Sequence, residues 1–411
     1  MNLNYFIAKR LIGSGNRKNR ISSPIIKIAI ISISIGVMIM LVSMATGIGL
    51  QHKIREKISA FSGHILINNY DSNQSDITLT PISTNQFFYP KFDSVSGIKN
   101  IQAYATIGGI IRTETDFEGF VYKGVDKQYD WSLFKPYLIE GKIPSFGVRK
   151  YNDSVVISKM MSDRLDLQLN DHFDAFFMRE NSNKPQRRVF KIAGIYDSGF
   201  EDFDKAYILG DLHMVQKLYK WKDTLVGGYE IILNDFNDID LKTDEIYHTI
   251  PPELNTQSIK DKFPLIFNWL SMFDFNIILI LVIIIFIAGL NMITTLLVMI
   301  LEKRQFIAMM KVLGANNKKL QHIFILQAAY IIAVGLFIGN ILGLGLVYLQ
   351  KYTGFITLDP ETYYVRTAPV YLNLKHVILL NAGVMTAIVL MLLLPVLVVS
   401  KISPVKVLKY E

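Results

Sequence analysis

Four long runs of residues carry no charged side chain, and they limit most strongly how this chain can fold. The runs are residues 28–50, 275–301, 323–349 and 377–400, each 23 to 27 residues long. At about 1.5 Å of rise per residue, a helix of this length crosses a hydrocarbon core of roughly 30 Å. We therefore predict four transmembrane helices. The first run is expected to remain as a span, because its apolar core is longer than that of a signal peptide.

The positive charges beside the runs predict the orientation. Residues 1–27 carry six basic side chains and no acidic one, and residues 302–322 carry five basic and one acidic. Residues 401–411 carry three basic and one acidic. Cytoplasmic loops collect Lys and Arg, so both termini and residues 302–322 are expected inside. Residues 51–274 and 350–376 are then outside.

Composition and motifs exclude several functions. The formal net charge of +8 arises beside the spans, so no nucleic-acid partner is predicted. The chain has no P-loop, no His-x-x-x-His pair and no cysteine, and Asp171, His172 and Asp174 fit a turn better than a metal site. No charge interrupts a span, which disfavours an ion relay. We expect a non-catalytic subunit without a bound cofactor, whose energy comes from elsewhere.

Residues 51–274 have the pattern of a soluble α+β domain. Alternating or apolar strand patterns and two helical patterns are spread along this segment. The strands are expected at residues 63–68, 155–157, 173–178, 188–195 and 229–233, and the helices at 158–167 and 211–219, the second capped by Asp211. Residues 179–188 are expected to form a long, basic hairpin tip. Helical patterns at both ends of the segment predict that the first two transmembrane helices extend beyond the bilayer as stalks.

The loop after the second run has an amphipathic pattern. Within residues 301–315, the side chains of Phe306, Met309, Met310 and Leu313 share one helical face, and Gly314 is the expected C-terminal cap. Such a helix fits docking to a soluble partner and equally fits resting on anionic lipid.

Two further patterns concern the last two runs. Gly335, Gly339 and Gly343 recur every four residues, which allows another helix to approach closely, either in the same chain or in a second subunit. We favour the same chain. Pro395 is expected to kink the fourth helix.

The loop Glu302-Lys-Arg-Gln-Phe-Ile-Ala-Met-Met-Lys-Val-Leu-Gly-Ala315 resembles the ATPase-contacting segment of the four-span permeases of bacterial ABC transporters, which include LolC/LolE, MacB and FtsX. That family often has an acidic residue where this chain has Phe306. The resemblance implies that Glu302, Phe306, Met309, Met310, Leu313, Gly314 and Ala315 couple the chain to an ATPase. It also implies that residues 51–274 form a MacB-like periplasmic core domain between the first two helices.

Further stretches are similar to the lipoprotein-releasing LolC/LolE branch. They are Tyr5-Phe-Ile-Ala-Lys-Arg10, Phe61-Ser-Gly-His-Ile65, Ile192-Ala-Gly-Ile-Tyr-Asp-Ser-Gly199, Ile356-Thr-Leu-Asp-Pro-Glu-Thr-Tyr-Tyr364 and Ser403-Pro-Val-Lys-Val-Leu-Lys-Tyr-Glu411. The resemblance implies an inner-membrane permease that extracts lipoproteins. Its implied partners are a LolD-like ATPase dimer that binds ATP and Mg²⁺, a second permease subunit, the lipoprotein substrate and a LolA-like periplasmic carrier.

Two sites follow from this resemblance. An apolar cavity for acyl chains is expected between the first and second helices of two subunits, lined by Met38, Met40, Met44, Ile278 and Ile285, although helix packing is an equal alternative for each methionine. The carrier is expected to contact the basic hairpin, through Arg179, Lys184, Pro185, Arg187 and Arg188.

Three other functions are considered. A MacB-like efflux or mechanotransmission permease usually carries a fused ATPase, and an FtsX-like regulator of cell-wall hydrolases usually has a smaller outer domain. A membrane anchor or receptor would leave the loop around Gly314 without a partner. The sequence favours lipoprotein release over all three.

Overall fold

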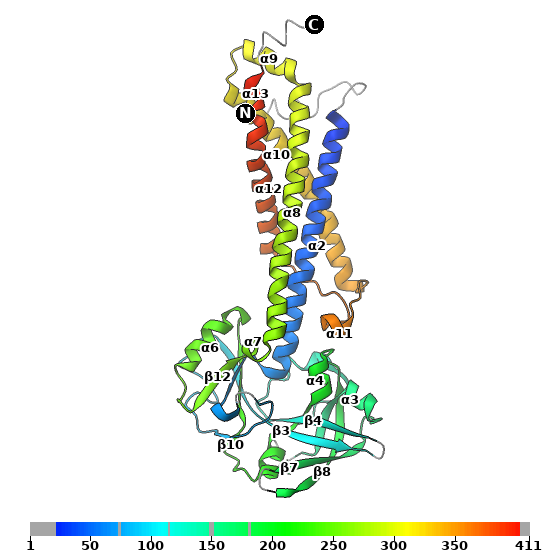
Figure 1. Ribbon diagram of the computed structural model, residues 1–411, viewed down its shortest axis with the longest axis vertical. Helices are drawn as coiled ribbons and strands as arrows, with labels where there is room; N and C mark the ends of the chain where they lie inside the picture. The colour runs from blue at the N-terminus through cyan, green and yellow to red at the C-terminus, as the bar shows by residue number, and fades with distance from the viewer. Residues whose placement is uncertain (1–21, 73–74, 114–115, 148–151, 180–181, 403–411) are drawn as a thin grey trace. The chain divides into compact units, whose positions relative to one another are not determined.

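The computed structural model describes residues 22–72, 75–113, 116–147, 152–179 and 182–402. The stretches 5–10 and 403–411, which contribute to the resemblance, lie outside the described residues. The chain divides into two compact units (Figure 1). The helical unit comprises Met1–Gln51, Trp269–Thr357 and Thr367–Glu411, and the α+β unit comprises His52–Asn268 and Leu358–Arg366.

Four helices in the described part of the chain are long and apolar enough to cross a membrane. Neither stalk is interrupted: the helix of the first run continues to residue 62, and that of the second run begins at residue 264. The fourth run is helical to residue 396 and again from residue 398, so the helix breaks next to Pro395. The helices are α2 (Ser22–Ser62), α8 (Pro264–Glu302), α10 (Asn317–Thr353) and α12 (Leu374–Val396), which α13 (Val398–Lys401) follows.

The glycines of α10 pack against α2 of the same chain. A Cβ atom at Gly335, Gly339 or Gly343 would lie within 3 Å of a side chain of α2. The Ser34 hydroxyl on α2 also donates to the Gly335 carbonyl, at 3.1 Å. The structure thus favours the same-chain alternative for these glycines. On another face of α10, Asn340 and Asn381 of α12 exchange amide hydrogen bonds of 2.7 and 3.0 Å.

A ten-stranded mixed sheet forms the centre of the α+β unit. Its order is β12-β1-β11-β3-β4-β9-β6-β8-β5, with β7 paired to β3 and β8. The pairs β4–β9 and β6–β8 are parallel, and the others are antiparallel. The strands are β1 (Ile65–Asn69), β3 (Ile98–Arg112), β4 (Phe117–Val125), β5 (Leu138–Gly141), β6 (Ser154–Ser158), β7 (His172–Arg179), β8 (Ser182–Tyr196), β9 (Tyr207–Asp211), β11 (Gly228–Leu233) and β12 (Leu254–Ser258), while β2 (Ile82–Ser83) pairs with β10 (Leu225–Val226).

All five predicted strands are present, and short helices join the strands of the sheet. Asp211 caps α5 as predicted, because its carboxylate accepts from the His213 N–H at 3.0 Å. Ser158 caps α3 by accepting from the Met161 N–H at 3.0 Å, but this helix ends at Arg164 and not at residue 167. The helices of this unit are α3 (Lys159–Arg164), α4 (Glu201–Ala206), α5 (Leu212–Tyr219), α6 (Ile239–Tyr247), α7 (Ile259–Lys262) and α11 (Pro360–Tyr363).

A buried ion pair anchors the end of α2 to the sheet. The Lys123 ammonium donates to a carboxylate oxygen of Glu230 and to the Phe61 carbonyl, both at 2.5 Å. The two charged side chains are only 3% and 2% exposed. The last carbonyls of a helix have no partner within the helix, so Lys123 satisfies one of them from the sheet. The Phe61 ring also stacks on Phe203, with ring centroids 4.8 Å apart.

His64 fixes the connection from α2 to β1. Its Nδ1 accepts a hydrogen bond from the Leu233 N–H at 2.9 Å, which requires that nitrogen to be unprotonated. Burial, and then the charge of Lys99, lowers the pKa of His64 to about 4. The imidazole is therefore neutral at neutral pH.

Candidate functional site

The loop with the ATPase-contacting pattern contains the helix α9 (Arg304–Val312). Leu313 is its C-cap, and Gly314 follows as the predicted left-handed residue that terminates the helix. The Gly314 N–H donates to the Lys311 carbonyl at 3.1 Å, and the Ala315 N–H donates to the Met310 carbonyl at 2.9 Å. This pair of bonds is the Schellman arrangement, and Gly314 has the positive φ, +88°, that the arrangement requires. The chain direction after α9 is thus fixed by backbone hydrogen bonds.

The apolar face of α9 differs from the predicted one. Ile307 and Ala308 are fully buried in the core of the helical unit, and Met310 and Ala315 pack against the same core. Phe306 is half-buried, whereas Glu302 is exposed. Of the predicted face, Met309 and Leu313 are exposed, at 58% and 75%, and they are joined by Val312 at 64%. Leu301, at the end of α8, is 59% exposed. Met310 is therefore a packing residue of this chain and not part of the exposed face.

The predicted basic tip is mostly strand. In the antiparallel β7–β8 hairpin, Arg179 pairs with Ser182 and Phe176 pairs with Arg187. The predicted hairpin is present, but the prediction of a long tip over residues 179–188 was wrong, because strand pairing continues to Arg179 and Ser182. The register shifts between Phe177 and Arg179, opposite Pro185, and such an irregularity accommodates a residue without an N–H.

The basic side chains of this hairpin are partly engaged. Lys184, Pro185 and Arg187 are exposed, and Arg188 is half-buried. The Arg187 guanidinium forms an ion pair of 2.9 Å with Asp174 on β7. Asp174, weighed above as a metal ligand, is thus an ion-pair partner within the hairpin.

An apolar groove of about 490 Å³ lies between α2 and α8 within the helical unit. Its two polar groups, Ser32 and Asn291, are hydrogen-bonded to each other at 2.7 Å. The lining residues are Ile28, Ile31, Ser32, Ile35, Gly36, Ile39, Ile284, Ile287, Ala288 and Asn291.

Of the residues predicted to line a cavity here, none lines this groove. Met40 and Met44 are 1% and 8% exposed and belong to the buried core, so the structure favours the helix-packing alternative for both. Ile285 is half-buried against that core, Met38 is half-buried, and Ile278 is 60% exposed. The isoleucines of the groove were missed because helical spacing alone does not show which face of α2 packs against α10.

Two stretches that lie far apart in the sequence are in contact in the α+β unit. Residues 358–366, in the loop between α10 and α12, belong to the α+β unit. There the Arg366 guanidinium forms an ion pair of 2.6 Å with Asp197, which lies in the stretch 192–199. The two residues are 169 positions apart, so sequence spacing gave no signal for this contact.

The α2 helix also contacts residues 358–366. The Lys57 ammonium donates to the Tyr364 carbonyl at 2.7 Å, and the Tyr364 and Phe200 rings lie 4.8 Å apart. Burial, and then the charge of Lys53, lowers the pKa of Lys57 to about 8. Helix α2, the stretch 192–200 and residues 358–366 therefore meet at one place in the α+β unit.

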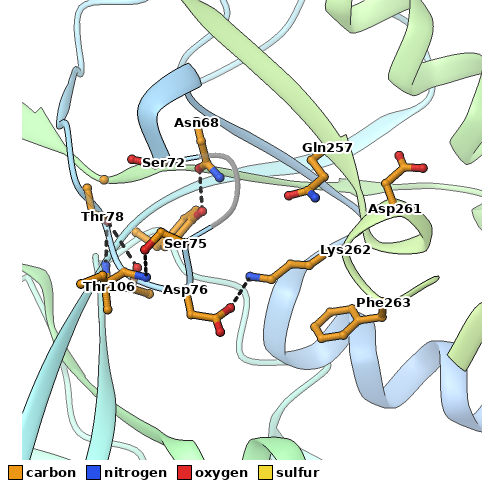
Figure 2. A pocket seen from close by; sticks show the side chains of 13 residues that line it. Asn68, Ser72, Ser75, Asp76, Thr78, Thr106, Gln257, Asp261, Lys262 and Phe263 are labelled. Carbon is orange, nitrogen blue, oxygen red and sulfur yellow. Dashed lines mark hydrogen bonds and ion pairs between the residues drawn. The ribbon is translucent and has the colours of Figure 1, made fainter. Parts of the chain in front are cut away.

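A polar pocket of about 490 Å³ lies elsewhere in the α+β unit, and its polar groups mainly bind one another. Figure 2 shows Thr78 beside Thr106 and Asp76 facing Lys262. The two hydroxyls are 3.3 Å apart, and the ion pair measures 3.5 Å. The pocket defines no ligand chemistry of its own.

Comparison with known proteins agrees with the resemblance drawn from the motifs. A profile described as "MacB-like periplasmic core domain" matches residues 28–247, more than half of the chain, and one described as "FtsX-like permease C-terminal" matches residues 278–404. The lipoprotein-releasing system transmembrane protein LolE of Haemophilus influenzae is 24% identical over 99% of each chain. LolC of Buchnera aphidicola subsp. Schizaphis graminum is 21% identical over 94% of each chain.

Among solved structures, the periplasmic region of MacB from Actinobacillus actinomycetemcomitans is similar at 15% identity, over 50% of this chain and 92% of that one. The TM-score of 0.34 is too low to carry an argument about fold. The family assignment rests on the two profiles. The chain therefore belongs to the family of ABC transporter permeases that combine a MacB-like periplasmic core domain with an FtsX-like permease domain, and it is a multi-pass membrane protein similar to LolC and LolE.

Proposed function

We propose that this protein is the permease subunit of an ABC transporter that extracts lipoproteins from the inner membrane and passes them to a periplasmic carrier. The observation that carries the proposal is similarity to LolE and LolC over nearly the whole chain, in both the helical and the α+β parts. Four spans, with both termini in the cytoplasm and the α+β domain in the periplasm between the first two, agree with the distribution of basic residues.

ATP and Mg²⁺ are bound by a separate, LolD-like ATPase dimer that docks on α9. The exposed apolar residues Met309, Val312 and Leu313, gathered at the C-terminal end of α9, support this part of the proposal, because an exposed apolar patch fits a docking surface for a protein partner. The Schellman end at Gly314 holds this helix in a defined direction.

The acyl chains of the lipoprotein bind between α2 and α8, facing a second permease subunit. The apolar groove there offers isoleucine side chains with a single hydrogen-bonded polar pair. Removing acyl chains from a bilayer costs about 0.8 kcal/mol per CH₂ group. An apolar surface that replaces the bilayer lowers this cost, and ATP hydrolysis by the partner supplies the rest.

A LolA-like carrier binds the β7–β8 hairpin. Lys184, Arg187 and Arg188 present basic groups on one strand, and Pro185 stands exposed among them. A carrier with an acidic rim would be attracted to this strand by charge complementarity.

Depletion of the protein in its host tests the function. Newly made outer-membrane lipoproteins are followed by membrane fractionation, and we expect them to accumulate in the inner membrane. Normal lipoprotein sorting together with a division defect would overturn the proposal in favour of an FtsX-like regulator. Normal sorting with a drug-export defect would favour a MacB-like permease.

Two matched variants test the docking of the ATPase. Leu313→Gln removes an exposed apolar side chain from α9, whereas Lys319→Gln changes an exposed residue on the first turn of α10. We expect Leu313→Gln to lose co-purification with the ATPase and to fail to complement the depletion. Lys319→Gln should behave as wild type. Equal ATPase recovery with both variants would refute docking on this face.

A further inference from the structure

Lys311, on the last turn of α9, reaches the end of the fourth long helix. Its ammonium donates to the carbonyl oxygens of Val399, Ser400 and Ile402, at 2.9, 3.1 and 2.8 Å. These carbonyls belong to or directly follow α13, the single turn after α12. All of these residues lie in the helical unit.

The chemistry of both partners fits this contact. The last carbonyl groups of a helix lack partners within the helix, and α13 is so short that its carbonyls depend on outside donors. A lysine ammonium has three donors and no acceptor, so three carbonyls can satisfy it fully. Its positive charge is also favourable at a helix C-terminus. Burial lowers the pKa of Lys311, as expected for an ammonium that has lost part of its water.

The hydrogen bonds of Lys311 connect α9 to α13 and so to α12, a connection that the course of the backbone does not provide. Along the chain, α9 is joined to α8 before it and to α10 after it, but not to α12. Ile307 of α9 and Val399 of α13 share the apolar core, yet apolar contacts are non-directional and let neighbouring helices slide. Three hydrogen bonds with defined directions resist such sliding.

We propose that Lys311 is a positioning residue that makes α12 and α13 move with α9, so that movement of the ATPase-docking helix reaches the fourth span as well as the second and third. The role in transport rests on the proposed function, but the connection itself does not. Two measurements therefore separate the two proposals.

The first measurement reports the connection without transport. The chain contains no cysteine, so Met309→Cys on α9 and Leu394→Cys on α12, both exposed positions, take spin labels at these two sites alone. The distance distribution is recorded by pulsed EPR on the full chain in nanodiscs. We expect a narrow distribution with Lys311 and with Lys311→Arg, and a broad one with Lys311→Met. An unchanged distribution in Lys311→Met would overturn the inference, whatever the protein transports.

The second measurement uses the full transporter in proteoliposomes with a fluorescent triacylated lipoprotein and the purified carrier. In Lys311→Met, which removes all three hydrogen bonds, we expect ATP hydrolysis to continue while lipoprotein released per ATP falls at least about tenfold, which corresponds to about 1.4 kcal/mol. Lys311→Arg should restore most of the release, and Lys318→Met, at an exposed lysine of α10, should match wild type. Release per ATP equal to wild type in Lys311→Met would refute the role in coupling. No ATP-dependent release by the wild type would instead refute the proposed function.

Discussion

Replacing Gly339 by alanine should weaken the contact between α10 and α2. A Cβ atom at this position would lie 2.7 Å from the Val37 Cβ, 2.8 Å from the Ser34 carbonyl oxygen and 3.1 Å from the Ser34 Cα. Two of these atoms belong to the backbone and the third is bonded directly to it. No side-chain rotation can relieve the overlap, so the two helices must separate by several tenths of an ångström.

Gly345, on the same helix, is the matched control. A Cβ atom there meets nothing within 4 Å. Both substitutions gain the same helix propensity of about 1 kcal/mol, so this gain cancels in the comparison. Overpacking costs typically 1–3 kcal/mol, and Gly339→Ala should therefore be less stable than Gly345→Ala by about 1–3 kcal/mol.

The free energies of unfolding are measured by SDS titration in mixed micelles, with helix content followed by circular dichroism. Gly383→Ala on α12, also without neighbours within 4 Å, provides a second control. If Gly339→Ala and Gly345→Ala agree within about 0.5 kcal/mol, the spread expected for independent sites, the close approach of α2 and α10 is refuted.

Three further predictions concern the α+β unit. As pH falls from 6.5 to 4, the unfolded chain takes up a proton at His64 before the folded chain does, because burial lowers the folded pKa to about 4. Between pH 6.5 and pH 4 the wild type should lose up to about 3 kcal/mol of unfolding free energy, and His64→Gln should not show this loss. Denaturant unfolding at each pH measures both. Lys123→Met leaves the Glu230 carboxylate buried without its partner and should lower the free energy of unfolding by about 3–5 kcal/mol. The double variant Lys123→Met/Glu230→Gln should recover part of this loss. A Lys123→Met protein as stable as wild type would contradict the buried ion pair. The Asp197–Arg366 pair, with Arg366 72% and Asp197 18% exposed, should contribute about 1 kcal/mol. Asp197→Arg should speed chymotryptic cleavage of residues 358–366, and the exchange Asp197→Arg/Arg366→Asp should restore protection.

The long helices, and five of the twelve strands in the described part of the chain, were predictable because each depends on local physics. Bilayer thickness decides the length of an apolar run, and alternation decides which segments form strands facing a core. The β7–β8 hairpin was predicted, but its tip is shorter than expected because the strands extend further toward the turn. At the register shift β8 spans four residues where β7 spans two, so the extra residues lie on β8 beside Pro185, and the alternation pattern alone does not show where such a shift occurs.

The candidate site was predictable only in part, because periodicity groups residues on a face without showing what that face touches. The position and C-terminal cap of α9 followed from its own sequence. The burial of Ile307 and Met310, and of Met40 on α2, depends on neighbouring helices distant in the chain. The hydrogen bonds of Lys311 to the carbonyls after α12 likewise join residues that are distant in the chain, so the sequence around Lys311 does not predict them.

The end of α9 carries a constraint of chirality and not of volume. Gly314 has a φ of +88°, yet a Cβ atom there would meet nothing within 4 Å. An L-alanine would be strained by its backbone alone, at about 1–2 kcal/mol, although there is ample room for its methyl group. A D-alanine introduced by chemical ligation would occupy the same space without that strain. Changes in the size of neighbouring side chains would therefore not relieve the requirement for glycine, since its origin is the handedness of the amino acids themselves.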